Sequence, residues 1–71
     1  MNLQAKRVTA AQLALEESGQ TDFDEVEGWE AVGNLLRKQI RWFDENGRRH
    51  KGAFAVTFET NSDVIVDCRW E

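Results

Sequence analysis

Residues 40–59, IRWFDENGRRHKGAFAVTFE, decide the fold of this chain. Asn46-Gly47 in the middle of this stretch is a strong short-range signal for a β-hairpin. The run 53–59 that follows alternates apolar and small or polar side chains, as a strand with one buried face does. The sequence therefore predicts two antiparallel strands joined at 46–47. A helix that continues to about Glu45, with Asn46 or Gly47 as its cap, is the alternative.

The last eight residues predict one more strand. After a polar turn at 60–63, the run 64–71 (VIVDCRWE) alternates in the same way. Cys68 belongs to its apolar side, and we expect it to be buried as a small hydrophobic side chain. Trp70 is expected to expose apolar surface, which predicts either a twofold homodimer through this edge or a direct contact with a target.

Two helices are predicted before the strands. Thr9 and Gln12 have the spacing of a capping box, which starts a first helix over about residues 10–18, or from Leu3 if it extends backwards. A second helix is predicted over about residues 22–36, because apolar side chains recur there at helical spacing. Two glycines inside that range weaken the helix and are expected to permit close packing on a sheet.

The predicted fold is therefore α+β, with two N-terminal helices packed on one face of a three-stranded antiparallel meander. Residues 1–71 are expected to form a single compact domain with a thin core. The predicted core consists of Leu13, Val26, Trp29, Val32, Leu36, Ile40, Phe54, Val56, Phe58, Val64, Val66 and Cys68.

Composition predicts the cellular compartment of the protein and the kinds of partner it disfavours. The single cysteine cannot form an intrachain disulfide, which fits a reducing compartment. The N-terminus lacks the apolar core of a signal peptide, and no apolar run is long enough for a membrane span. We therefore expect a cytoplasmic protein. The net charge of −4 disfavours nonspecific binding to nucleic acid, although a local basic face could override it.

Charge is sorted along the chain. No Lys or Arg occurs between Arg7 and Arg37, and this interval is rich in carboxylates. The simplest interpretation is a set of helix-end charges and a solvated face. The functional interpretation is an acidic surface that docks onto the basic surface of a larger protein. The residues of this predicted surface are Glu16, Glu17, Asp22, Asp24, Glu25, Glu27 and Glu30.

The next segment reverses the sign of the charge. Residues 37–51 contain six cations and two aromatic side chains, Trp42 and Phe43. Basic surfaces interleaved with rings bind single-stranded nucleic acid, so a small nucleic-acid-binding regulator is the alternative function. The same charges could simply protect a sheet edge from pairing. The predicted nucleic-acid-binding residues are Arg37, Arg41, Arg48, Arg49 and Lys51.

No enzymatic or metal-binding motif emerges. His50, the only histidine, lies among cations and has no partner in a known catalytic signature. An EF-hand loop starting at Asp22 would need Gly and Glu where Glu27 and Gly33 stand. A phosphate-binding glycine loop is not found either. We therefore expect a non-enzymatic protein without metal or cofactor.

A short acidic chain of this profile resembles small accessory proteins of bacteriophages. Within that group it is most similar to anti-CRISPR and other DNA-mimic anti-defence proteins, by overall profile and without a shared motif. The resemblance implies an inhibitor that blocks a nucleic-acid-binding site on a bacterial defence complex, and the host cytoplasm as its compartment. Glu16–Glu30 is the region that such a mimic would use, whereas the basic segment departs from a pure DNA mimic.

Overall fold

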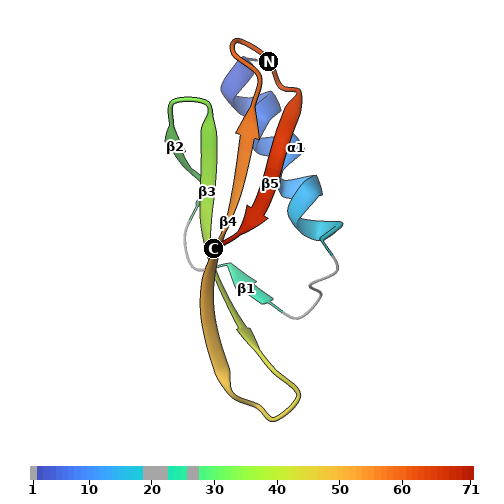
Figure 1. Ribbon diagram of the computed structural model, residues 1–71, viewed down its shortest axis with the longest axis vertical. Helices are drawn as coiled ribbons and strands as arrows, with labels where there is room; N and C mark the ends of the chain where they lie inside the picture. The colour runs from blue at the N-terminus through green and yellow to red at the C-terminus, as the bar shows by residue number, and fades with distance from the viewer. Residues whose placement is uncertain (1, 19–22, 26–27) are drawn as a thin grey trace.

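The computed structural model describes residues 2–18, 23–25 and 28–71 (Figure 1). In this part of the chain one helix is followed by five strands. The elements are α1 (Leu3–Glu16), β1 (Phe23–Glu25), β2 (Glu30–Val32), β3 (Leu35–Phe43), β4 (Arg49–Phe58) and β5 (Ile65–Trp70).

The strands form one antiparallel sheet in the order β1-β3-β4-β5. The short strands β1 and β2 both pair with β3, opposite residues 40–42 and 35–37 respectively, so they share one side of that strand. The β3–β4 hairpin is the longest pairing and extends beyond every other element, as Figure 1 shows. The molecule is consequently elongated, with dimensions of 42 × 20 × 19 Å.

The hairpin predicted at Asn46-Gly47 is confirmed, and the alternative of a long helix is wrong. β3 and β4 pair from Leu35↔Thr57 to Phe43↔Arg49. Gly47 has φ 75°, the left-handed conformation that glycine adopts without strain. Its N–H donates to the Asp44 carbonyl at 3.0 Å and closes the turn.

The prediction of two helices on a three-stranded meander is wrong. Within residues 22–36, the described part contains the strands β1 and β2 instead of a second helix. β2 ends in a tight turn at Gly33-Asn34, where Gly33 has φ 59°. A positive φ does not occur in an α-helix, so this glycine is a hairpin residue and not a helix-packing one. Asp22, Val26 and Glu27 lie outside the described residues.

The first helix begins at Leu3, the earlier of the two predicted starts. α1 starts at Leu3, and the Asn2 side chain accepts a hydrogen bond of 2.8 Å from the Ala5 N–H as its N-cap. Thr9 is interior to the helix, where its hydroxyl donates to the Ala5 carbonyl. The predicted capping box at Thr9 is therefore wrong, and Gly19 lies outside the described residues.

The core lies between α1 and one face of the sheet. Leu36, Ile40, Phe54, Val56 and Phe58 are buried as predicted, and Trp29 is partly buried against them. The helix contributes Ala11 and Leu15, which the prediction missed.

Several predicted core positions are exposed. Leu13 is 53% exposed because it faces away from the sheet side of α1, and Val32 is 61% exposed on the short strand β2. Val64 and Val66 are 52% and 57% exposed at the outer edge of the sheet, where Cys68 is exposed as well. The register shift near Phe58 places Ile65 opposite Phe58 and against the core, in place of Val64 and Val66. Cys68 lies opposite Val56 on β4, and its exposure shows that the described elements do not cover it.

Arg7 joins α1 to two turns of the sheet. Arg7 is 7% exposed, and its guanidinium donates to the Ser62 carbonyl at 2.7 Å, to the Glu59 carbonyl at 2.9 Å and to the Asn34 Oδ1 at 3.2 Å. It also lies 5.2 Å from the centre of the Phe58 ring. One helical side chain therefore fixes the β2–β3 and β4–β5 turns together.

Gly52 makes room for the Trp42 ring, and its replacement by Ala is expected to destabilise the protein. A Cβ at this position would lie 2.9 Å from the backbone oxygen of Glu71 and 3.1 Å from the ring of Trp42. Overpacking of this kind costs about 1–3 kcal/mol. Urea unfolding should show a lower midpoint with an unchanged m-value. Glu45→Ala, at an exposed position of the hairpin turn, is a control for which we expect little change. Equal midpoints for Gly52→Ala and the wild type would refute the steric account.

No helix in the described part of the chain is long and apolar enough to cross a membrane.

Candidate functional site

One face of the sheet carries no helix in the described part of the chain. Leu36, Lys38 and Ile40 alternate with more exposed neighbours along β3, so the even-numbered residues of β3 face α1. The odd-numbered residues therefore lie on the opposite side, which we call the open face. Through the register of β3 with β4 and β5, the open face also includes residues 49, 51, 53, 55, 57, 67 and 69.

The open face gathers cations that are far apart in the sequence. Arg41 lies directly opposite Lys51, and Phe43 lies opposite Arg49 in the next row. Arg37 lies opposite Ala55, whose neighbour on β5 is Arg69. Four of the five residues predicted for nucleic-acid binding thus share one face, and the fifth, Arg48, lies in the adjoining turn.

The two halves of the open face differ in charge. Away from the hairpin tip, Arg37 pairs with the Glu71 carboxylate and Arg69 pairs with Asp67, both at 2.9 Å. Towards the hairpin tip, Arg48, Arg49 and Lys51 are exposed and form no ion pair with the described residues. We call this second half, composed of Arg41, Phe43, Arg48, Arg49 and Lys51, the hairpin surface.

Arg41 lies at the centre of the hairpin surface. Its Nε is buried and has no hydrogen-bond partner among the described residues. Its backbone neighbour on β1 is Asp24, one of the residues of the predicted acidic surface. Phe43 next to it is 53% exposed, so a large ring lies on the surface between cations.

Asp44 organises the hairpin tip. Its Oδ1 accepts hydrogen bonds of 2.9 Å from the N–H groups of Asn46 and Arg48, and its Oδ2 lies 2.8 Å from His50 Nε2. The hydrogen bond with His50, followed by that from the Arg48 N–H, lowers the pKa of Asp44 below its ordinary value of 3.8. The carboxylate of Asp44 is therefore engaged within the turn.

The tip should lose order in acid. Because the pKa of folded Asp44 is lowered, its contribution to stability is present above pH 3.8 and is lost as the pH falls through the folded pKa. We expect the amide resonances of Asn46 and Arg48 to titrate with a midpoint below 3.8, and those of β4 residues near Val56 to stay constant. The Asp44→Asn variant should abolish this titration, and a midpoint above 3.8 would contradict the assigned hydrogen bonds.

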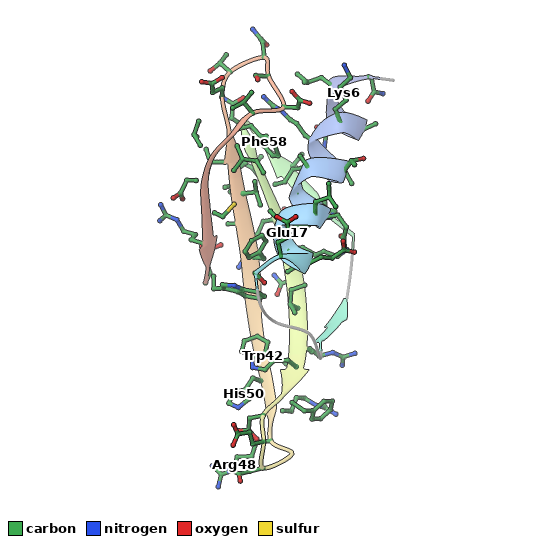
Figure 2. All side chains as sticks on the ribbon, turned by 90° about the vertical axis from the view of Figure 1, so that its right-hand side faces the viewer. Lys6, Glu17, Trp42, Arg48, His50 and Phe58 are labelled. Carbon is green, nitrogen blue, oxygen red and sulfur yellow. The ribbon has the colours of Figure 1, made fainter. Side chains whose placement is uncertain are left out.

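The opposite side of the hairpin carries a cluster of rings. Trp42 stacks on His50 with 5.6 Å between the ring centres (Figure 2). Trp70 meets Trp42 edge-on at 6.0 Å. Trp70 also contacts Phe54 at 4.9 Å and is 39% exposed. These ring contacts pack the side of the hairpin that faces away from the hairpin surface.

The predicted acidic surface is distributed over several elements. Glu16 and Glu17 lie exposed at the end of α1, and Glu17 is its C-cap. Asp24 and Glu25 belong to β1, and Glu30 lies opposite Arg37 in the β2–β3 pair. Asp22 and Glu27 lie outside the described residues. Part of the acidic segment therefore flanks the basic strand instead of forming a separate helix face.

A hollow of about 390 Å³ lies between α1 and β3. Lys38 lines it and is only 6% exposed, with its Nζ 3.3 Å from Gln12 Oε1 and 5.3 Å from the centre of the Trp29 ring. Gln12 Oε1 also accepts from Trp29 Nε1 at 3.2 Å. Lys38 thus serves the packing of α1 and is separated from the other cations of the segment 37–51.

No protein-family model, curated protein or solved structure matches this chain. The resemblance to anti-defence proteins therefore stays a prediction.

Proposed function

We propose that the protein binds single-stranded nucleic acid through the hairpin surface. The observation that supports this most is the pairing of Arg41 with Lys51 and of Phe43 with Arg49 in successive rows of the open face. Phosphates are bound by clustered Arg and Lys, and bases stack on exposed rings between them. The function is binding and requires no catalytic group.

The β3–β4 pairing by itself does not favour this arrangement. Like charges directly opposite each other destabilise an antiparallel pair, and Arg41–Lys51 is such a pair, whereas the only opposite charge in the described part of this row is Asp24, on the far side of Arg41. Opposite charges would stabilise the same positions. A bound polyanion would neutralise the row, so its presence favours a role in binding.

Phe43 favours nucleic acid over an acidic protein as the ligand. A ring that is 53% exposed beside Arg49 offers a stacking surface for a base, whereas an acidic protein surface would require only the cations. Ala53 and Ala55 at the centre of the open face are buried, so the accessible cations and the exposed ring lie towards the hairpin tip.

The acidic-surface inhibitor stays a prediction that competes with this proposal. Exposed Glu16 and Glu17 at the end of α1 are available to a basic partner. Charge reversal at Glu25, Glu27 and Glu30 should abolish such binding and leave nucleic-acid binding intact. The two hypotheses therefore make opposite predictions for the same variant.

Fluorescence anisotropy with short labelled oligo-dT tests the proposal. Four cations predict a slope of log affinity against log salt of about −3 for a single strand, a loss of roughly fiftyfold between about 50 and 200 mM salt. Phe43→Ala should weaken oligo-dT binding with little change in this slope, because it removes stacking and no charge. A duplex and poly-glutamate serve as competitors. Undetectable binding to oligo-dT at low salt, or equal displacement by poly-glutamate, would overturn the proposal.

A further inference from the structure

The outer side of β5 is a free edge of the described sheet. β5 pairs with β4, and no other described strand pairs with it. Just beyond it, Ala53 and Glu71 exchange backbone hydrogen bonds of 3.2 and 2.7 Å. Bonded and non-bonded pairs alternate along an antiparallel ladder, so the N–H and C=O groups of Cys68 and Trp70 point away from β4. These groups are available to another strand.

The same edge exposes apolar side chains. Val64 is 52% exposed, Val66 is 57% exposed and Trp70 is 39% exposed, and Cys68 between them is exposed as well. The protection of this edge is modest, consisting of the paired charges Asp67 and Arg69 and a register shift near the start of the strand. A free edge with an apolar row and few charges is suited to strand addition.

We propose that this edge pairs antiparallel with β5 of a second copy, about a twofold axis at Cys68. In that register Asp67 of each copy lies opposite Arg69 of the other, and Val66 lies opposite Trp70. Two opposite-charge pairs and two apolar pairs then form across the interface. The sequence of β5 is therefore complementary to itself.

The other central registers are not complementary. When a twofold axis perpendicular to the sheet relates two antiparallel strands, the numbers of any two opposite residues add up to the same even number. The axis therefore passes between two copies of the same residue. An axis at Asp67 would place two carboxylates opposite each other, and an axis at Arg69 would do the same with two guanidinium groups. The charges of β5 thus select the register at Cys68.

This dimer would extend the open face. The perpendicular axis keeps both copies of α1 on one side of a continuous sheet and both hairpin surfaces on the other. A longer strand of nucleic acid could then contact two hairpin surfaces at once, which raises apparent affinity without new contacts. This consequence rests on the proposed function, whereas the dimer itself does not.

Disulfide trapping tests the register. Directly opposite residues of a hydrogen-bonded antiparallel pair have Cα atoms about 5.5 Å apart, within the range of a disulfide. A mild oxidant should therefore convert the wild type to a Cys68-linked dimer at micromolar concentration. Partial burial and the nearby Asp67 raise the pKa of the Cys68 thiol, so the reaction is run at alkaline pH. A control with Cys68→Ser and Asp63→Cys, whose new thiol has no counterpart in this register, should stay uncrosslinked.

Charge exchange provides the second test, by sedimentation of the reduced protein. Arg69→Asp places carboxylates opposite each other and should weaken dimerisation by roughly tenfold to a hundredfold. The double variant Asp67→Arg/Arg69→Asp restores both pairs in the proposed register and should recover the dimer. A wild type that sediments as a monomer throughout the micromolar range, or a double variant no better than Arg69→Asp, would overturn the proposal.

Discussion

Arg7→Met is expected to lower the free energy of unfolding by about 3 kcal/mol, because it removes three partly buried hydrogen bonds made by one charged donor. The guanidinium donates to Ser62, Glu59 and Asn34, and Met can replace only its apolar stem. For a domain of this size the loss corresponds to a fall in Tm of roughly 12–24 °C. Urea unfolding followed by tryptophan fluorescence measures it directly.

The adjacent Lys6 is a matched control for this prediction. Lys6→Met removes a cation one residue away, but from an exposed position, and should change stability by less than about 0.5 kcal/mol. Arg7→Lys keeps the charge and loses the fork geometry, so we expect an intermediate effect. Equal losses for Lys6→Met and Arg7→Met would mean that the buried hydrogen bonds contribute little.

Arg49→Glu/Lys51→Glu is expected to reduce affinity for oligo-dT at least about a hundredfold at low salt, because two of four cations become repulsive. The same change should leave stability equal or slightly higher, since a carboxylate would replace the Lys51 ammonium opposite Arg41. Anisotropy and urea unfolding measure the two effects on the same sample.

A loss of affinity for oligo-dT without a loss of stability would show that these cations serve binding and are not needed for the structure. If the cations served only to shape the hairpin, reversing them would lower stability and affinity together. The triple variant Gln4→Glu/Lys6→Glu/Thr9→Glu carries the same change in net charge at exposed positions of α1, away from the hairpin surface and from β5, and it should retain most of the affinity for oligo-dT. Comparable losses in both variants would indicate a response to net charge alone.

The β3–β4 hairpin was predictable because its signals are local. Asn46-Gly47 favours a tight turn, and the alternation of apolar and polar side chains on either side of it predicts strands with one buried face. Once the turn is fixed at that position, the pairing brings Arg41 next to Lys51 and Phe43 next to Arg49. The part of the candidate site on the hairpin therefore follows from the sequence.

The second helix was predicted wrongly because helical spacing was given more weight than turn chemistry. Gly33-Asn34 is a two-residue hairpin signal that interrupts the apparent apolar stripe. β1 and β2 are too short to show a clear hydrophobic period, and they are strands because they pair with β3. Here tertiary context overrode local preference.

The role of Arg7 depends on contacts that sequence spacing does not reveal. Its partners Asn34, Glu59 and Ser62 are brought to it by two turns far along the chain. The exposure of Cys68 and Val66 has a similar cause, since alternation marks an apolar side without showing whether an element covers it. Neither feature could be derived before the single helix was placed.

The most direct test of the account is an amide chemical-shift titration of the labelled protein with unlabelled oligo-dT at low salt. The proposed function predicts that perturbed resonances cluster on Arg41, Phe43 and residues 48–51, at the opposite end of the molecule from Lys6 (Figure 2). The amides of Glu16 and Glu17 should stay unchanged. Perturbations centred on Glu16 and Glu17, or none at saturating oligo-dT, would contradict the assignment of the hairpin surface as a nucleic-acid-binding site.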